Sequence, residues 1–304
     1  MEKRNGREGA DFRGIWLALL AAALYALGTP FSKLLLQELP PTLTAGFLYL
    51  GAGICMLTLS LLRRLTGRRN EERLSRRELP FTVLMILLDI AAPVLLMWGL
   101  RTAGAAEASL LGNFEIVATA LIALAVFREA ISPRLFAGIL FVTLSCALLS
   151  VTDLRSFRFS GGAALVLGAA TLWGLENNCT RKISSKDPLQ IVLLKGIGSG
   201  AGALVTGLLL GERTERFLPV LFALLLGAVA YGLSIYCYVY AQRRIGAART
   251  SAFYAVCPFI GVLLSLLIFR ELPGRMFIPA LCLMLLGAWL CSGEGPLFRR
   301  KKHE

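Results

Sequence analysis

The segment GAAEASLLGNFEIVATALIALAVFRE, residues 104–129, returns without a gap as GAARTSAFYAVCPFIGVLLSLLIFRE at residues 246–271. Nine of the 26 aligned positions are identical, and they include the Gly-Ala-Ala start and the Phe-Arg-Glu end. Apolar helices resemble one another by composition alone, so the ends that match in register carry the comparison. The chain therefore contains an internal duplication with an offset of 142 residues.

The whole chain is divided into apolar stretches of similar length. Its residues are 56% hydrophobic and its mean hydropathy is +0.69, which is too apolar for a soluble domain. A helix needs about 20 apolar residues to cross a bilayer. We expect an all-α integral membrane protein with ten transmembrane helices, at residues 14–36, 42–62, 80–100, 103–127, 134–151, 161–183, 188–210, 217–241, 246–269 and 273–293.

The linker at 152–160 divides these ten spans into two sets of five. Because five is odd, the second set enters the membrane from the side opposite to the first. Inverted repeats of this kind build many alternating-access transporters. The sequence predicts two inverted five-helix repeats, at residues 14–151 (spans one to five) and 160–292 (spans six to ten), with tails at 1–13 and 293–304.

The net charge of +13 is distributed unevenly between the two sides of the membrane. With the N-terminus inside, 23 of the 32 Lys and Arg residues lie in cytoplasmic segments and seven lie in outer loops. Such a bias sets the orientation of membrane helices. We expect a multi-pass protein of a prokaryotic cytoplasmic (plasma) membrane with both termini cytoplasmic. The basic loops are then neighbours of membrane lipid, and no nucleic-acid partner is expected.

Residues for metal or catalytic chemistry are scarce. The one histidine is His303 in the tail, and the seven cysteines lie in or beside spans without a CxxC pair. There is no Gly-rich phosphate loop and no nucleophile with a histidine base. We therefore expect no metal, no cofactor and no enzymatic activity.

The chain resembles the drug/metabolite transporter (DMT) superfamily in its ten-span form with two EamA domains. The resemblance covers residues from about 14 to 292. It rests on Phe127-Arg128-Glu129 and Phe269-Arg270-Glu271, on the Ala-rich starts of spans four and nine, and on the pairs Tyr25-Ala26 and Trp173-Gly174. Pro258 matches the family's proline in span nine, whereas span four has Ile116 at the equivalent position. The resemblance implies a central cavity lined by spans one, three, four, six, eight and nine. Members of this superfamily mostly export amino acids and other small metabolites, or carry nucleotide sugars and related solutes, so the resemblance does not imply one substrate.

Two carboxyl groups lie near the middle of the bilayer. Asp89 is about ten residues into span three and Glu115 about twelve into span four, which at about 1.5 Å per residue reaches the middle third. A charge there costs roughly 2.5–3.5 kcal/mol on insertion scales, so it indicates function by default. No Lys or Arg within these two spans neutralises them. We expect Glu115 and Asp89 to couple transport to a proton or another cation, the alternative being a protonated carboxyl bonded to a neighbouring helix.

Glu176 and Lys195 lie at matching depths in the antiparallel spans six and seven. We therefore expect an ion pair between them. The pair either locks the two helices together or acts as a gate or substrate clamp.

Polar side chains form one face on each of spans one and six. Tyr25, Thr29 and Ser32 are spaced i, i+4, i+7, and so are Trp173, Asn177 and Thr180. Unpaired polar groups in hydrocarbon are costly, so both faces are expected to point inward. They are candidates for substrate binding, with packing between helices as the alternative. The other candidates are Trp98, Asn113 and Tyr254.

The sequence thus predicts a secondary-active or facilitative transporter that exports a small metabolite, such as an amino acid, by alternating access. The alternative is proton-coupled efflux of cationic compounds through Glu115 or Asp89. A monomer and a homodimer remain equally open as the working unit.

Overall fold

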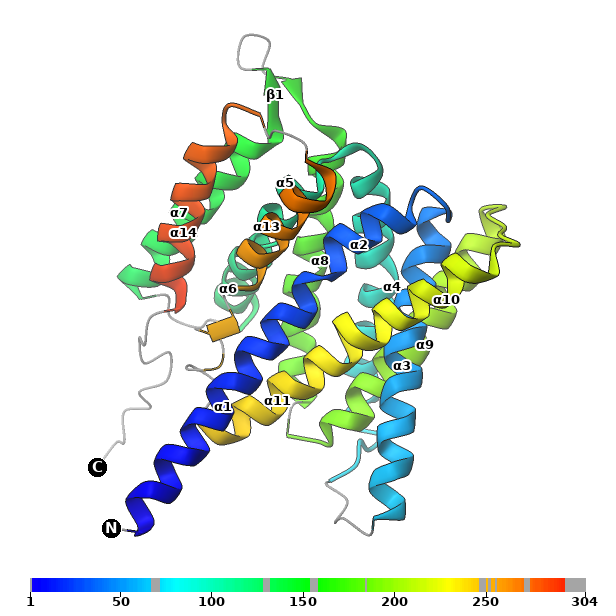
Figure 1. Ribbon diagram of the computed structural model, residues 1–304, viewed down its shortest axis with the longest axis vertical. Helices are drawn as coiled ribbons and strands as arrows, with labels where there is room; N and C mark the ends of the chain where they lie inside the picture. Colours follow the sequence, from blue (N-terminus) through cyan, green and yellow to red (C-terminus); the bar gives the residue numbers. More distant parts are fainter. Residues whose placement is uncertain are drawn as a thin grey trace.

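The protein is a bundle of helices in the computed structural model (Figure 1). Residues 2–66, 72–127, 132–153, 158–183, 185–245, 250, 253–254, 256–270 and 274–292 are described, without side chains at 2–12, 151–159, 242–243 and 292. The elements of the first half are α1 (Glu2–Ala26), α2 (Gly28–Leu35), α3 (Pro41–Leu65), α4 (Leu79–Thr102), α5 (Ala105–Leu111), α6 (Phe114–Phe127) and α7 (Pro133–Ser150). The strands β1 (Val151–Asp153) and β2 (Arg158–Phe159) form an antiparallel hairpin in the linker. The second half contains α8 (Gly161–Ile183), α9 (Pro188–Leu209), α10 (Phe217–Leu226), the π-helix η1 (Gly227–Leu233), α11 (Ser234–Ile245), α13 (Cys257–Phe269) and α14 (Phe277–Ser292).

Most of these helices are long and apolar enough to cross a membrane. Seven segments meet both conditions, namely Arg13–Leu35, Pro41–Leu65, Leu79–Thr102, Ala105–Val126, Pro133–Ser150, Pro188–Leu209 and Phe217–Ala241. Two shorter apolar helices, Cys257–Phe269 and Phe277–Cys291, follow. One more helix, α8, forms the sixth span; it has 23 residues but carries the polar run Glu176-Asn177-Asn178. The all-α membrane fold that the sequence predicts is confirmed, and ten helices match the ten predicted spans.

Spans one, four and eight are each interrupted by a break or a change of helix type. Span one breaks at Leu27, where α1 ends and α2 begins ahead of Pro30. Span four breaks at Gly112 and Asn113, between α5 and α6. Span eight passes through η1, in which the helix is wider than an α-helix. Breaks and π-segments leave backbone groups that neighbouring helices must satisfy, and they recur at functional sites. At the N-terminus, α1 already begins at Glu2, within the predicted tail.

The strongest helix contacts join the two halves of the chain. α3 packs against α9, and both are the second helix of their half; α7 packs against α14, and both are the fifth. α4, the third span of the first half, packs against α8, the first span of the second. The equivalent contact with the halves exchanged is between α1, in the first span of the first half, and α11, in the third span of the second half. These two helices also pack extensively. The two halves thus interlock around a common interior.

Small residues allow this close packing. A Cβ atom on Gly53 of α3 would lie 2.7 Å from the backbone nitrogen of Ile197 in α9. Gly51 meets the carbonyl group of Leu224, and Gly227 of η1 meets that of Leu48, so closely that a side chain at either glycine has no room. In lipid, where the hydrophobic effect does not draw helices together, such small residues at the interface supply the attraction through packing.

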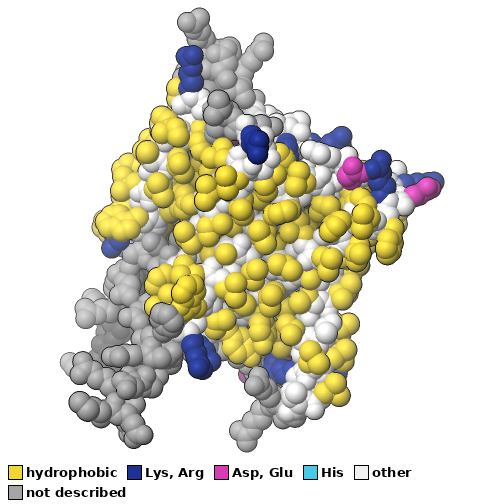
Figure 2. All heavy atoms as spheres, viewed as in Figure 1, with side chains coloured by type: hydrophobic (Ala, Val, Ile, Leu, Met, Phe, Trp, Pro, Cys, Tyr) yellow, Lys and Arg dark blue, Asp and Glu magenta, His cyan; other side chains and the backbone are white. Residues whose placement is uncertain are grey.

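The surface shows how the bundle lies in a membrane. Hydrophobic side chains cover the middle of the face drawn in Figure 2, and the basic and acidic side chains lie at its upper and lower margins. α1 begins at the lower end of the bundle, whereas the β1–β2 hairpin, after which α8 begins, lies at the upper end (Figure 1). The first helices of the two halves therefore run in opposite directions. Below, the end at which α1 begins is called the inner end, because the charge bias of the sequence predicts that it faces the cytoplasm.

Candidate functional site

A cluster of three ionisable side chains lies inside the bundle. Lys195 Nζ is 3.0 Å from Asp89 Oδ2 and 3.0 Å from Glu176 Oε2. The side chains of Asp89 and Glu176 are 0% and 2% exposed, whereas that of Lys195 is 17% exposed. The cluster joins α4, from the first half, to α8 and α9, from the second. The pair between Glu176 and Lys195 matches the depths read from the sequence.

Asp89 differs from the unpaired carboxylate that the sequence suggests. Spans three and four hold no cation for it, but Lys195 comes from span seven. Local packing sets this register: glycines at 198 and 202 of α9 leave space for Ile86 and Ile90 of α4. Ser199 Oγ also donates a hydrogen bond to the carbonyl oxygen of Ile86 at 3.2 Å. Asp89, one turn from Ile86, is thereby placed against α9.

Tyr49 of α3 extends the cluster. Its hydroxyl group donates to Asp89 Oδ1 at 3.2 Å and accepts a hydrogen bond from Trp173 Nε1 at 3.2 Å. Trp173 is one of the predicted binding residues, and it is buried in α8. Tyr49 is not among the predicted residues, because its contacts with Asp89 and Trp173 come from two other helices.

The remaining members of the predicted face of span six also contact acidic groups. Asn177 Nδ2 donates to Glu115 Oε1 at 2.6 Å, and it lies 3.4 Å from Thr119 Oγ1. Thr180 Oγ1 donates to Glu176 Oε1. One helical face of α8 therefore connects Glu115 on α6 with the network that contains Lys195.

Tyrosine rings pack beside the charged cluster. Tyr231, in η1, has its ring centroid 5.5 Å from that of Tyr25 and 5.6 Å from that of Tyr49. Tyr254 lies 5.9 Å from Tyr25 and 4.8 Å from Tyr238. The pairs Tyr25–Tyr231 and Tyr238–Tyr254 meet edge to face and the other two are tilted, and aromatic rings at such distances attract one another. The structure thus brings the predicted residues Tyr25 and Tyr254 together, and it adds Tyr231.

The rest of the predicted face of span one lies beyond the break at Leu27. Thr29 is half-buried, and Ser32 is fully buried with no described hydrogen-bond partner for its Oγ. Asn113, at the break in span four, is also buried, and its Nδ2 has no partner among the described residues. Buried polar groups are normally satisfied, so these two side chains are available to hydrogen-bond a solute or water.

Trp98 is the predicted residue that the structure separates from the others. It lies near the outer end of α4 with 38% of its surface exposed. Its Nε1 donates to Thr42 Oγ1 at 3.1 Å, and the guanidinium of Arg101 lies 5.6 Å from its ring centre. Thr42 in turn donates to Glu212, whose carboxylate accepts the backbone N–H of Leu43 at 2.9 Å and so caps the start of α3. This group joins α3, α4 and Glu212 at the outer end of the bundle.

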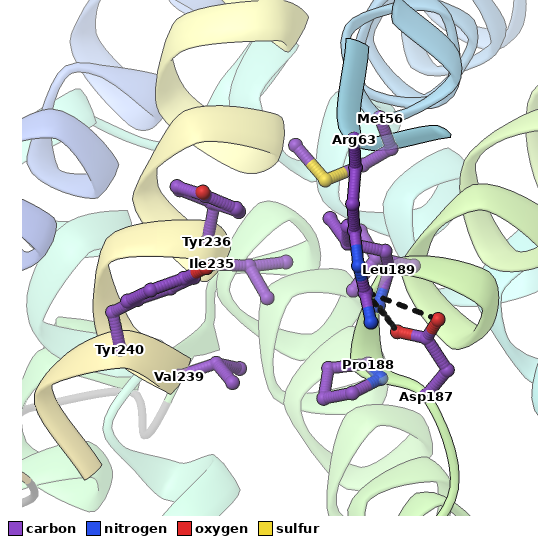
Figure 3. Close-up of a pocket in the computed structure, with 10 residues that line it drawn as sticks. Met56, Arg63, Asp187, Pro188, Leu189, Ile235, Tyr236, Val239 and Tyr240 are labelled. Atoms are coloured by element: carbon purple, nitrogen blue, oxygen red, sulfur yellow. Dashed lines mark hydrogen bonds and ion pairs between the residues drawn. The ribbon is translucent and has the colours of Figure 1, made fainter. Parts of the chain in front are cut away.

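The inner end also has a polar contact, an ion pair that lies beside a pocket, shown in Figure 3. Arg63, near the end of α3, pairs with Asp187 at 3.1 Å, and Asp187 accepts the N–H of Leu189 at the start of α9. The pocket lies next to this pair and is also lined by Met56, Val192, Tyr236 and Tyr240. We call it the inner pocket. Tyr240 lines it from α11.

The inner loops are tied together outside the membrane. Ser75 donates its N–H and its hydroxyl group to Glu78 at 2.7 and 2.6 Å, and these bonds lower the pKa of Glu78. Lys186 pairs with Glu72, and the hydrogen bond to that carboxylate raises the pKa of Lys186. The backbone N–H of Asp187 also donates to the carbonyl oxygen of Glu72 at 2.9 Å. The segment before α4 is thus held against the loop before α9.

Comparison with known proteins agrees with this architecture. The profile of the EamA-like transporter family matches residues 12–151 and again residues 160–293. The chain is 27% identical over 285 residues to an "Uncharacterized transporter" of Methanothermobacter thermautotrophicus, covering 87% of this chain and 82% of that relative. A solved crystal structure shares the fold, with a TM-score of 0.62 and 18% identity over 93% of this chain and 96% of the other. The matches to the family profile span most of the chain, once in each half. This protein belongs to the EamA-like transporter family.

Proposed function

We propose that the protein exports a small metabolite, such as an amino acid, across a prokaryotic plasma membrane by alternating access. The observation that supports this most is the cluster of Lys195, Asp89 and Glu176, which offers both signs of charge in the interior of the bundle. An ammonium group and a carboxylate of one solute find complementary partners there. The tyrosine rings beside the cluster supply apolar and cation–π contacts for the rest of the solute.

Polar contacts at both ends are consistent with a carrier rather than an open channel. We propose that Glu212 and Thr42 close the outer end, and that Arg63 and Asp187 close the inner end. A carrier opens one end at a time, and each closure consists of a few polar contacts that can break without unfolding a helix. Equivalent helices of the two halves also pack against one another, and such a repeat is expected for alternating access.

Counterflow in proteoliposomes tests this proposal. Vesicles that contain the purified protein and a high internal concentration of one unlabelled amino acid are mixed with the labelled compound, and transient label accumulation is recorded. A panel of amino acids, matched amines and matched carboxylic acids identifies the solute class. Accumulation with zwitterions, and its loss in Trp173→Ala and Asn177→Ala protein of normal stability, supports the proposal. Equal accumulation in protein-free vesicles contradicts it.

A second candidate is proton-coupled efflux of cationic compounds, and the surroundings of Glu115 favour it. Its carboxyl group accepts from the amide of Asn177 and has no ion pair among the described residues. Asp89 is less suited to this role because it already has a cation 3.0 Å away, namely Lys195, which it shares with Glu176. If this candidate holds, a pH gradient drives the efflux of a cationic dye, and Glu115→Gln removes that drive while Asp89→Asn does not.

The orientation is part of the proposal, with both termini in the cytoplasm. Reaction of a membrane-impermeant label with a cysteine placed in the tail at 293–304 tests it. In intact cells such a cysteine is expected to react only after the membrane is opened.

A further inference from the structure

The inner pocket and the charged cluster are separated along the bundle, yet two helices run from one to the other. α3 and α9 both line the inner pocket, and both also reach the cluster. Whether the same face of each helix is involved at both places follows from the spacing of the residues. Side chains seven positions apart on an α-helix lie on nearly the same face, two turns from each other.

On α3 the relevant residues are Arg63, Met56 and Tyr49, each seven positions from the next. Arg63 and Met56 line the inner pocket. Tyr49 continues this face by two more turns, about 10 Å farther into the bundle. Its hydroxyl group ends on Asp89 Oδ1, 3.2 Å away.

On α9 the corresponding residues are Pro188, Val192 and Lys195, at i, i+4 and i+7. Pro188 and Val192 line the inner pocket. Lys195 lies one turn beyond Val192, and its ammonium group ends 3.0 Å from Asp89 Oδ2. The lining faces of two separate helices, followed inward from one pocket, thus arrive at the two oxygens of a single carboxylate.

We propose that the inner pocket is the entry site for the transported solute, and that these faces of α3 and α9 wall one pathway from it to Lys195 and Asp89. The inference rests on the proposed function and adds the route and an additional binding site. Arg63 and Asp187 present a positive and a negative charge at the mouth of the route. Lys195 and Asp89 present the same pair of charges at its other end, in the interior of the bundle. A small zwitterion can therefore exchange one pair of partners for the other.

Met56 constricts this route. It is 0% exposed and lies midway between Arg63 and Tyr49 on the lining face of α3. Its flexible thioether can move aside for a solute at little cost, which a branched side chain cannot do as readily. The rings of Tyr236 and Tyr240, whose centroids are 4.6 Å apart, cover the pocket from the side of α11 (Figure 3).

Thiol modification tests the route without requiring a known substrate. The full-length protein, with its seven native cysteines replaced, receives one cysteine at Val192 or, as a control, at Leu194, which is 36% exposed on another face of α9. A charged, water-soluble methanethiosulfonate reacts with thiolates, which form in water and not in lipid. We expect Val192→Cys to react about tenfold faster or more than Leu194→Cys, because only the former thiol borders the aqueous route. Adding Met56→Ala is expected to raise the rate at Val192→Cys further and to leave Leu194→Cys unchanged.

The outcomes separate the route from the proposed function. Equal rates at Val192→Cys and Leu194→Cys, unchanged by Met56→Ala, overturn the route. If Val192→Cys protein does not fold, Leu189→Cys, which lines the same pocket, takes its place with the same expectation. A reactive Val192→Cys in protein that moves no solute leaves the route in place and counts against the proposed function. If the protein catalyses counterflow while its Val192→Cys thiol stays inert, the proposed function is supported and the route is contradicted.

Discussion

Asn177 Nδ2 lies 2.6 Å from Glu115 Oε1, so an amide from the second half of the chain holds the carboxyl group of the first half. The contact joins α8 to α6 close to the break in span four. In the part of the chain that the structure describes, this amide is the side-chain hydrogen-bond partner of Glu115. It can hold the carboxyl group in either protonation state, because it donates to an oxygen that both forms possess.

Glu115→Gln therefore separates charge from hydrogen bonding. The glutamine oxygen can still accept from Asn177, so we expect the unfolding temperature to change little. If Glu115 exchanges a proton, transport by the variant loses its dependence on a pH gradient. Efflux from proteoliposomes at several imposed gradients measures this. A variant that keeps the wild-type rate and pH dependence removes Glu115 from the coupling mechanism.

Lys195→Met is expected to destabilise the protein. The substitution leaves the carboxylates of Asp89 and Glu176 buried without their cation, and breaking a buried ion pair in this way commonly costs about 3–5 kcal/mol. The loss is measured by thermal unfolding in detergent. The triple variant Lys195→Met, Asp89→Asn, Glu176→Gln should recover most of the stability, because it removes the uncompensated charges together with the lysine. A single variant as stable as the wild type would show that the cluster is hydrated and not held by its ion pairs.

Tyr49 and Trp173 are expected to act as one unit. Tyr49→Phe removes the hydroxyl group that joins the Trp173 indole to Asp89, and a hydrogen bond to a charged group contributes about 1.5–3 kcal/mol. Trp173→Phe removes only the bond that the indole N–H donates to the Tyr49 hydroxyl group, which Tyr49→Phe also removes. In a double-mutant cycle the combined loss should fall short of the sum by about 0.5 kcal/mol or more. Strict additivity in the unfolding free energies would mean that the bond does not couple the two halves.

Gly227→Val tests the contact between η1 and α3. A side chain at this position meets the carbonyl group of Leu48, which cannot move without displacing α3. We expect a loss of several kcal/mol or no folded protein, as is typical for overpacking against backbone. Gly161→Ala at the exposed start of α8, where no atom lies within 4 Å of the new methyl group, is the control and should change stability by less than about 0.5 kcal/mol. Comparable yields of both proteins from the membrane fraction would contradict the packing described for Gly227.

The sequence predicts the fold well because hydropathy and helix length are local properties. The spans and the pairing of Glu176 with Lys195 follow from residues within one span or two adjacent ones, and the duplication follows from comparing two stretches of sequence directly. The pairing of Asp89 with Lys195 does not, since it depends on how far α4 slides along α9. That register is set by the small residues at 198 and 202, which receive Ile86 and Ile90.

The candidate site shows the same division. The face of Trp173, Asn177 and Thr180 is a property of one helix, and each of these side chains contacts a polar or acidic partner in the structure. The face of Tyr25, Thr29 and Ser32 assumes a continuous helix that the break at Leu27 interrupts. Trp98 has an apolar ring with a polar N–H group, and such side chains are common both at membrane interfaces and in binding sites. Its position in the sequence does not distinguish the two locations. Tyr49, which touches both Asp89 and Trp173, becomes visible only when three helices are assembled.

The π-segment in span eight has a mechanical consequence. It stores one more residue in its turns than an α-helix of the same length would hold. Returning that residue to α-helical geometry would turn everything after it by about 100° and advance it by about 1.5 Å. Tyr236 and Tyr240 would then swing away from the inner pocket while α10 stayed in place. Rewinding this single helix would therefore change which side chains face the pocket, without a rigid-body movement of either half.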